Sequence, residues 1–385
     1  MTTPGMASQM HTLLKHVGVE PFTKEEEWTA IDSFMEGFVS CKKAKKLGVT
    51  GMALNVFNKD GRLAHRYDSG DVSNQRLHVA SVSKLVSALV LMACVSDGDI
   101  KLEDTTGEIL GWDGEKGTIT LDNLGSMTSG LIVDDDSMYR SDLTLAQSVD
   151  IIAEYELMTP PGSQFYYKST DWQVAARMVE VATGKSWNQL FEEKIKKRVG
   201  LRDPGLQFTQ LDSSSKNPTH LFLYGRMVDF NEDTDNPLCA AGLQATVSEL
   251  SEILFLILNH GDNRGGETVI KSQYIERMFT NKYTNCKMFR DDVTGGFTIL
   301  GYRYGFGCWL ERDISKMVKM HFGNDFYKIN SLGVYGTTPW IDMEHEYFAI
   351  MSMEGTDPST CYLSYEMTYR LQRTIARTIG RHHND

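Results

Sequence analysis

The sequence predicts an α/β (α+β) fold, in which an antiparallel β-sheet is flanked by N- and C-terminal helices and carries a large inserted, mostly helical subdomain. Three observations predict this fold. Strand-like runs occur at 51–67 and return after about residue 295. Helical periodicity of apolar residues dominates the stretch between them. Amphipathic helices are predicted near both ends, so both ends of the chain supply sheet and covering helices.

These patterns divide the chain into an arm and a domain. The length of 385 residues fits two or three domains, or one large enzyme domain with a subdomain. We expect a loose arm at 1–23 and a single domain at 24–385. Its sheet subdomain would comprise about 24–78 and 297–385, and its helical subdomain about 79–296.

The first predicted elements are a helix and a hairpin. An apolar stripe predicts the helix at 24–41. Two strand-like runs follow at 51–58 and 62–67, and the sequence Asn-Lys-Asp-Gly at 58–61 is a strong hairpin signal. The residues of the helical stripe are Trp28, Ile31, Phe34 and Phe38.

Helices are predicted in the middle of the chain, where apolar residues recur every three or four positions, and strands return near its end. Gly184 follows one such apolar run and is expected to end that helix. The helices are expected at 122–128, 144–155, 172–183, 187–199, 248–259 and 273–279. The later strands are expected at 302–309, 334–341 and 347–353, before a last helix that carries Met367, Leu371, Ile375 and Ile379.

The composition excludes several classes of protein. A net charge of −12 and a pI near 5.4 argue against binding to nucleic acid or to an anionic membrane. No apolar run reaches the roughly 18 residues of a membrane span, and the N-terminus lacks the apolar core of a signal peptide. We therefore expect a soluble, cytoplasmic protein. The 6 cysteines are scattered without a Cys-x-x-Cys pair, which favours reduced thiols over disulfides or a zinc site.

The chain is organised around a buried helix that follows Ser81. Apolar residues surround most of this helix after Lys84, so it should be buried. Residues three apart share a helix face, which lets the Lys84 ammonium reach the Ser81 hydroxyl. A serine becomes a nucleophile when a neighbouring base takes its proton, and a lysine can be that base if its surroundings lower its pKa.

Ser-x-x-Lys alone is a weak signal. The spacing also occurs from Ser40 to Lys43 and from Ser213 to Lys216, in stretches that resemble solvated surface. Only the copy at 81–84 opens a buried helix. For any single copy, a helix cap or an exposed pair is the commoner explanation.

Two further stretches carry residues suited to catalysis. Residues 160–172 form a turn followed by Tyr166 and Tyr167, and a tyrosine hydroxyl beside a lysine ammonium can relay a proton. Residues 331–340 are glycine-rich at the expected start of a strand, where backbone N–H groups can face a substrate. The alternatives are an aromatic pair that packs a loop and an ordinary strand edge with a bulge.

Read together, these stretches resemble the serine β-lactamase and penicillin-binding-protein family, and within it the class C β-lactamase-related esterase branch. Residues 80–84 (Ala-Ser-Val-Ser-Lys) resemble the nucleophile motif, and residues 98–104 resemble the segment after its helix. Residues 124–131 are similar to the family's Leu-Leu-Thr-His-Thr-Ser-Gly-Leu, with Met127 in place of the histidine.

The resemblance continues to about residue 380. Residues 161–169 resemble Pro-Gly-x-x-Phe-x-Tyr-Ser-Asn, with Tyr167 at the tyrosine position and Ser169 where asparagine is usual. Residues 240–246 are similar to Ala-Gly-Gly-Leu-x-Ser-Thr, and residues 301–307 to the Gly-Tyr-Gly-x-Gly strand.

The resemblance implies a role for each matching residue. Ser81 would attack a carbonyl with Lys84 as its base, and Tyr167 would relay a proton to the leaving group. The backbone N–H groups of Ser81 and Val334 would form the oxyanion hole. Four aromatic side chains are candidates for the lining of an apolar acyl pocket, and for each of them plain core packing is at least as good an explanation, namely Tyr166, Phe306, Tyr335 and Trp340. The expected substrate-binding residues are Ser169, Ser331, Gly333, Tyr335, Tyr166, Phe306 and Trp340.

One motif departs from the family. The family has Lys-Thr-Gly or His-x-Gly where this chain has Ser331, Leu332 and Gly333. A serine cannot supply the positive charge that holds a β-lactam carboxylate. The departure counts against β-lactam hydrolysis and leaves acyl transfer intact.

We therefore expect a serine hydrolase or acyltransferase that acts on an ester, thioester or small amide. Its partner would be a small-molecule acyl substrate, with no nucleic acid, membrane, metal or organic cofactor involved. One alternative is a non-catalytic binding or scaffold protein with the same fold, although the intact Ser81, Lys84 and Tyr167 count against it. Another is a β-lactamase or a peptidase for D-amino-acid substrates, which Ser331 disfavours.

Overall fold

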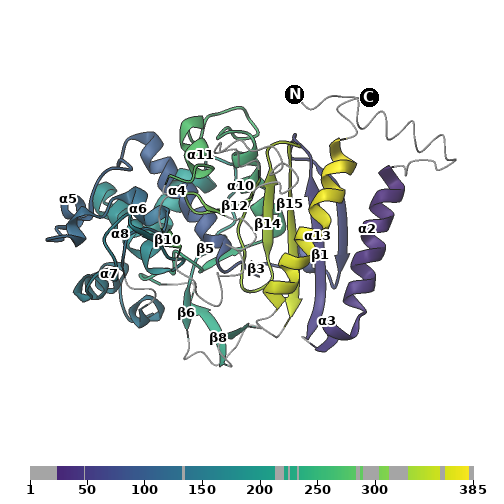
Figure 1. Ribbon diagram of the computed structural model, residues 1–385, viewed down its shortest axis with the longest axis horizontal. Helices are drawn as coiled ribbons and strands as arrows, with labels where there is room; N and C mark the ends of the chain where they lie inside the picture. Colours follow the sequence, from purple (N-terminus) through teal and green to yellow (C-terminus); the bar gives the residue numbers. More distant parts are fainter. Residues whose placement is uncertain are drawn as a thin grey trace.

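The structure is a computed structural model (Figure 1). It describes residues 24–46, 48–131, 135–212, 221–223, 226–231, 234–282, 287–288, 303–311, 328–355 and 360–380. The expected N-terminal arm lies outside the described residues.

A seven-stranded antiparallel sheet joins the two ends of the chain, as the sequence predicts. Its strand order is β11-β12-β13-β14-β15-β1-β2. The longest pairing runs between β1 and β15, from Val49 opposite Gly355 to Phe57 opposite Phe348. The strands are β1 (Val49–Phe57), β2 (Leu63–Ser69), β11 (Arg303–Tyr304), β12 (Trp309–Glu311), β13 (Lys328–Asn330), β14 (Thr338–Asp342) and β15 (Tyr347–Gly355).

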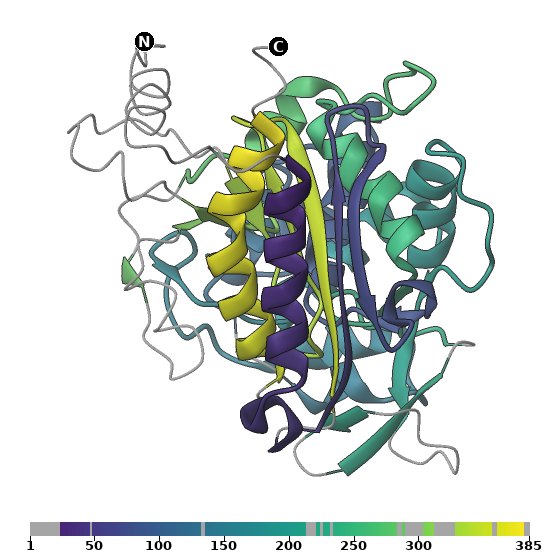
Figure 2. The same ribbon diagram turned by 90° about the vertical axis from the view of Figure 1, so that its right-hand side faces the viewer.

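Two helices from opposite ends of the chain cover one face of this sheet. Helices α2 (Lys24–Val39) and α13 (Thr360–Gly380) lie side by side against it (Figure 2). Their apolar residues and those of β1, β14 and β15 form a separate core cluster, with Trp28 and Met367 among its buried members. The flanking helices predicted from the sequence are therefore confirmed.

The helical body lies against the other face of the sheet (Figure 1). Helix α4 (Val82–Asp97) runs through its centre, and its residues from Val82 to Ser96 are buried. Within the described residues, the helical body also contains α5 (Thr106–Leu110), α6 (Leu121–Gly125), α7 (Leu145–Glu154), α8 (Thr170–Thr183), α9 (Trp187–Phe191), α10 (Val247–Leu258) and α11 (Ser272–Met278). The short helix α3 (Lys42–Lys46) instead belongs with α2, and its Ala44 is part of the core cluster of the covering helices.

Short strands form small sheets within the helical body. Strand β9 (Leu243–Ala245) pairs with both β3 (Leu77–His78) and β5 (Gln207–Phe208). Strand β4 (Gln164–Phe165) pairs with β10 (Lys287–Met288), and β8 (Arg226–Asn231) pairs with β6 (Gln210–Asp212) and β7 (Leu221–Leu223).

Local sequence explains where most helices begin and end. In a capping box, the hydroxyl of the residue before the helix accepts a hydrogen bond from the N–H of the third helical residue. The polar side chain of that third residue accepts a hydrogen bond from the backbone N–H of the capping residue. Gly184 ends α8 with a φ of 71°, as predicted, and Gly98 ends α4 with a φ of 85°. Such capping boxes start α5, α6, α7, α9 and α10, at Thr105, Thr120, Thr144, Ser186 and Thr246.

Three predicted elements are wrong in their extent. The described part of 302–309 is a hairpin of β11 and β12 instead of one strand, because the chain turns at Gly307 with a φ of 78°. The strand predicted at 334–341 begins only at Thr338, after a turn in which Gly336 has a φ of 94°. The helix predicted at 187–199 is α-helical only over α9 and then continues as one π-helical turn, Glu192–Lys196.

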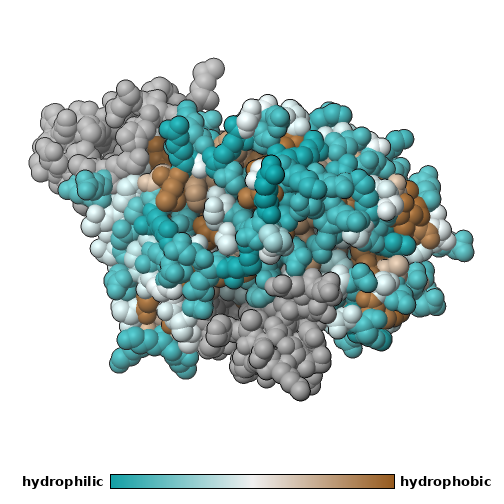
Figure 3. Space-filling view, turned by 180° about the vertical axis from the view of Figure 1, so that it is seen from behind, coloured by the Kyte–Doolittle hydropathy of each residue, from teal (hydrophilic) through white to brown (hydrophobic). Residues whose placement is uncertain are grey.

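The surface of the described residues is mostly hydrophilic on one face of the molecule. On the face in Figure 3 hydrophilic residues predominate, and hydrophobic residues gather in small separate groups. Among the described residues, no helix combines the length and the apolar character needed to cross a membrane.

Candidate active site

Ser81 caps the N-terminus of α4, and Lys84 lies within its first turn. The Lys84 Nζ is 3.1 Å from the Ser81 Oγ, as the three-residue spacing predicts. The same ammonium donates to the Ala240 carbonyl at 3.1 Å, and the side chain is almost completely buried, with 2% of Lys84 exposed. A nucleophile and a base are therefore in hydrogen-bond contact at the start of a buried helix.

The backbone around Ser81 is held from both sides. Ala80 has a φ of 47°, which is uncommon for a residue with a side chain. In the first turn of α4, the Ser83 hydroxyl accepts a hydrogen bond from the Leu243 N–H at 3.0 Å. Ser87 donates to the Cys239 carbonyl at 2.7 Å. These contacts fix α4 against the segment that also supplies the Ala240 carbonyl.

Tyr167 presents its ring to Lys84. The Lys84 Nζ lies 5.0 Å from the centroid of the ring, which is within cation–π distance. The ring of Tyr167 stacks on Trp309, with centroids 5.2 Å apart, and meets Tyr304 edge-on at 5.9 Å. Strands β11 and β12 of the large sheet therefore orient the tyrosine against the lysine.

Lys168 is directed elsewhere. Its side chain is buried and forms an ion pair with Asp171 at 3.5 Å. It also donates to the Leu131 carbonyl at 3.3 Å. Burial raises the pKa of Asp171 from 3.8 to about 6, against the opposing effects of Lys168 and of the hydrogen bond from Ser129. The lysine that faces Tyr167 is thus Lys84.

The turn after β13 lies against the nucleophile. The Ser331 Oγ donates to the backbone carbonyl of Ser81 at 3.0 Å, and Ser331 is buried. A Cβ at Gly333 would meet the Val79 carbonyl oxygen at 2.5 Å, so only glycine allows this approach. The Ser331 hydroxyl, which the sequence predicts to contact substrate, donates to the backbone of the nucleophile.

Two backbone donors remain unused beside this turn. Within the described residues, neither the Ser81 N–H nor the Val334 N–H donates a hydrogen bond to the protein. Val334 is 41% exposed, so this residue lies at the surface of the protein. Free donors of this kind are what an oxyanion hole requires.

Two aromatic residues expected in the acyl pocket belong to the core. Phe306 and Trp340 are each 0% exposed. Phe306 meets Trp172 edge-on and fills the space next to Gly125, where a Cβ would lie 2.1 Å from its ring. Trp340 donates to the Tyr347 hydroxyl at 3.1 Å. We correct the expectation for both, because each side chain is enclosed by the core contacts named here and has no exposed surface.

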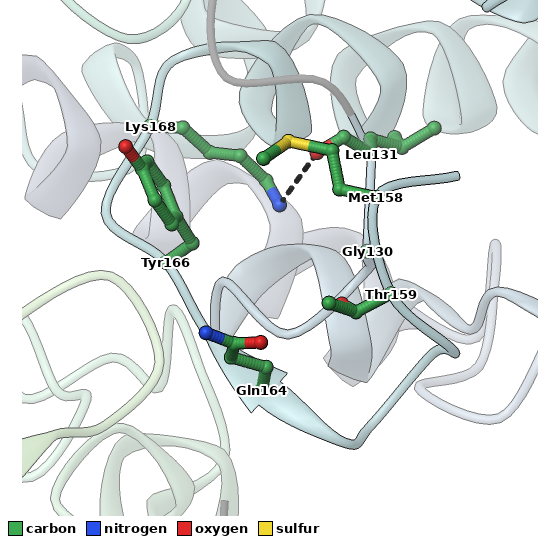
Figure 4. A pocket seen from close by; sticks show the side chains of 7 residues that line it. All are labelled: Gly130, Leu131, Met158, Thr159, Gln164, Tyr166 and Lys168. Carbon is green, nitrogen blue, oxygen red and sulfur yellow. Dashed lines mark hydrogen bonds between the residues drawn. The ribbon is translucent and has the colours of Figure 1, made fainter. Parts of the chain in front are cut away.

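The other expected substrate residues are more accessible. Ser169, Tyr335 and Tyr166 are half-buried. Tyr166 lines a separate pocket together with Lys168 (Figure 4). Sequence reasoning assigned no role to three participants, namely Ala240, Tyr304 and Trp309. The first two lie in the stretches 240–246 and 301–307 that resemble family motifs, whereas Trp309 lies outside them.

Other reactive groups offer no second centre in the described part of the chain. No group of three or more metal-ligating side chains comes together there. Cys94, Cys239 and Cys308 are free and buried. Burial raises the pKa of the Cys94 thiol to about 12 and that of Cys239 well above its usual value, so neither is a thiolate at neutral pH.

Comparisons with known proteins identify the family of this chain. Residues 30–368 match the family model described as beta-lactamase. Penicillin-binding protein 4 of Amycolatopsis lactamdurans is 32% identical over 168 residues, which are 40% of this chain and 44% of that protein. The match thus spans less than half the length of this relative.

Solved structures show the same fold over almost the whole chain. A beta-lactamase-like protein from Bacteroides dorei superposes with a TM-score of 0.69 and 23% identity, covering 89% of this chain and 98% of the other. EstCE1, described as a hydrolase with promiscuous acyltransferase activity, superposes with a TM-score of 0.64 and 18% identity, covering 93% and 98%.

Proposed function

Because this chain belongs to the beta-lactamase family of serine hydrolases, we propose that it is a hydrolase or acyltransferase that forms an acyl-enzyme at Ser81. Its substrate would be an ester, a thioester or a small amide. The observation that carries the proposal is the 3.1 Å contact between the Lys84 Nζ and the Ser81 Oγ at a buried position.

The first step is attack of Ser81 on the substrate carbonyl. Lys84 in its unprotonated form accepts the hydroxyl proton as the bond between Oγ and the carbonyl carbon forms. The charge that develops on the carbonyl oxygen is stabilised by the unused N–H groups of Ser81 and Val334. Loss of one such donor typically costs about 3 to 4 kcal/mol of transition-state stabilisation.

The second step is departure of the leaving group. The proton taken by Lys84 has to reach the leaving atom, and we assign this relay to the Tyr167 hydroxyl. The 5.0 Å distance between the Lys84 Nζ and the centroid of the Tyr167 ring supports the assignment, because it keeps the two side chains close together. When the bond to the leaving group breaks, the acyl group remains on Ser81 as an ester. Water then gives a carboxylic acid, whereas another alcohol, thiol or amine gives acyl transfer.

The substrate class follows from the turn after β13. Ser331 is neutral, and its hydroxyl is engaged by the Ser81 carbonyl. A substrate carboxylate would therefore find no cation at this position. This supports a neutral acyl donor over a β-lactam or a peptide with a free C-terminal carboxylate. The similarity to EstCE1, a hydrolase with promiscuous acyltransferase activity, supports hydrolysis and acyl transfer as the chemistry.

Intact-protein mass spectrometry tests the proposal. The wild type is exposed separately to a short p-nitrophenyl ester, an acyl thioester and a penicillin. We expect an acyl adduct from the ester or thioester that is absent in Ser81→Ala. Ser87→Ala is the matched control, because it removes a buried hydroxyl from the same helix and should keep the adduct.

The outcomes separate the alternatives. An adduct that persists in Ser81→Ala would rule out Ser81 as the nucleophile. Labelling by the penicillin faster than by either other reagent would contradict the preference for neutral donors. No adduct and no p-nitrophenol release from any reagent would instead favour a binding protein with this fold.

A further inference from the structure

The segment 164–168 presents different side chains to its two sides. Phe165 and Tyr167 point into the aromatic group around Trp309. The side chains of Gln164, Tyr166 and Lys168 line a pocket instead (Figure 4). This alternation is what an extended segment produces. The pocket therefore lies behind the loop that carries Tyr167.

The pocket is a small cavity of about 280 Å³. It lies just below the usual range for drug-sized ligands, which is about 300 to 1,000 Å³, so it suits a molecule of a few carbon atoms. None of Ser81, Lys84 and Tyr167 belongs to its wall. Its lining residues are Gly130, Leu131, Met158, Thr159, Gln164, Tyr166 and Lys168.

Lys168 is the single cation among these lining residues. An ammonium has three N–H donors. In the described structure it makes two contacts, to the Leu131 carbonyl at 3.3 Å and to Asp171 at 3.5 Å. Both are longer than a usual N–H···O hydrogen bond of about 2.7 to 3.2 Å. One of its three N–H donors therefore has no acceptor among the described residues, so the ammonium can take an anionic partner.

Neutral donors accompany the cation. Among the described residues, the side chains of Gln164 and Thr159 have no hydrogen-bond partner. Figure 4 shows Gln164, Thr159 and Lys168 around the same space. Asp171 does not line the pocket, and one oxygen of its carboxylate also accepts a hydrogen bond from Ser129. That oxygen is shared between two donors, which weakens its hold on Lys168.

We propose that this pocket binds a short aliphatic carboxylate. The Lys168 ammonium would pair with the carboxylate, and Gln164 and Thr159 would donate hydrogen bonds to it. The side chains of Leu131 and Met158 would contact the hydrocarbon chain. The binding site is distinct from the acyl-enzyme centre, and the proposal stands whether or not Ser81 is acylated.

Isothermal titration calorimetry with sodium butyrate tests the proposal, with butyramide as the neutral isostere. The protein is the Ser81→Ala variant, which cannot be acylated. Butyrate is expected to bind at least about tenfold more tightly than butyramide, since a hydrogen bond to a charged group is worth more than a neutral one. Equal binding of the two, or no binding of butyrate, would overturn the proposal.

Three further variants in the Ser81→Ala background locate the site. Lys168→Met should abolish the preference for butyrate. Met158→Trp fills the pocket from its rim and should weaken the binding of butyrate at least about tenfold. Because Met158 is 50% exposed, this variant should fold even if Lys168→Met does not. Lys84→Met should leave binding unchanged. Loss of binding in Lys84→Met, with binding retained in Met158→Trp, would place butyrate in the acyl-enzyme centre and refute the proposal.

Discussion

Replacing Lys84 by methionine should remove most of the catalytic activity while it leaves the fold intact. Methionine resembles the lysine side chain in length, but it carries no charge and has no basic nitrogen that could accept a proton. General base catalysis contributes roughly 10² to 10⁴ in rate, which corresponds to about 3 to 5 kcal/mol in the activation free energy. We expect kcat/KM for a p-nitrophenyl ester to fall by this factor.

The expected loss of folding stability is smaller than the expected loss of activity. The variant leaves the Ala240 carbonyl without its 3.1 Å contact to the ammonium, which costs about 1 to 3 kcal/mol if no water replaces it. Removal of a buried charge offsets part of this cost, because the ammonium no longer has to be desolvated. The free energy of unfolding should therefore change less than the activation free energy.

A matched control separates the two effects. Lys196 is another buried lysine, paired with Glu192 at 2.6 Å and placed in the π-helical turn away from Ser81. Lys196→Met should cost a similar amount of stability, measured by thermal unfolding, without a loss of esterase rate. The reasoning fails if folded Lys84→Met keeps more than about a tenth of the wild-type kcat/KM, or if both variants lose activity equally.

Three other changes probe the surroundings of the site. Ser331→Ala removes the hydrogen bond to the Ser81 carbonyl and should lower kcat about 2- to 10-fold, whereas Ser331→Thr should restore it. An unchanged kcat in Ser331→Ala would show that this contact does not position the nucleophile. Trp309→Leu removes the stack on Tyr167 and should lower kcat by a similar factor with little effect on KM, so a change in KM alone would contradict a role in orientation. Burial raises the pKa of Asp171 to about 6, so the folded state binds the proton of this carboxyl more tightly than the unfolded state does. The stability that proton binding provides is therefore lost as the pH rises from about 4 through 6. Thermal unfolding of Asp171→Asn should lack this decline, and parallel curves for the two proteins would refute the assignment.

The parts of the site that depend on neighbouring residues could be predicted from the sequence. Helix α4 is encoded by a long apolar run, and the contact between Ser81 and Lys84 follows from their spacing on it. The hairpin of β1 and β2 follows from the turn signal between them. In each case the interacting residues are close in the chain, so local periodicity contains the information.

The parts that depend on distant residues could not be predicted. The Ala240 carbonyl is 156 residues from Lys84 in the chain, and nothing in its local pattern indicates this contact. Alternating aromatic and small residues at 302–309 favour a strand, yet Gly307 turns the chain and brings Trp309 onto Tyr167. The sequence predicts that Ser331 faces a substrate, and only the folded chain shows that its hydroxyl bonds to Ser81. Tertiary packing decided these positions.

The pairing of β1 with β15 has a consequence for how the protein is made. Val49 lies opposite Gly355, so this ladder cannot close until the residues through Gly355 have left the ribosome. The strands on either side of this pair include β14 and β2, and the turn that bonds to Ser81 precedes β14. Closure of such a long loop is slow, and the edge of β1 stays unpaired meanwhile. An incomplete chain therefore carries the nucleophile without the turn that holds it, so premature termination should yield inactive, aggregation-prone fragments instead of partly active enzyme.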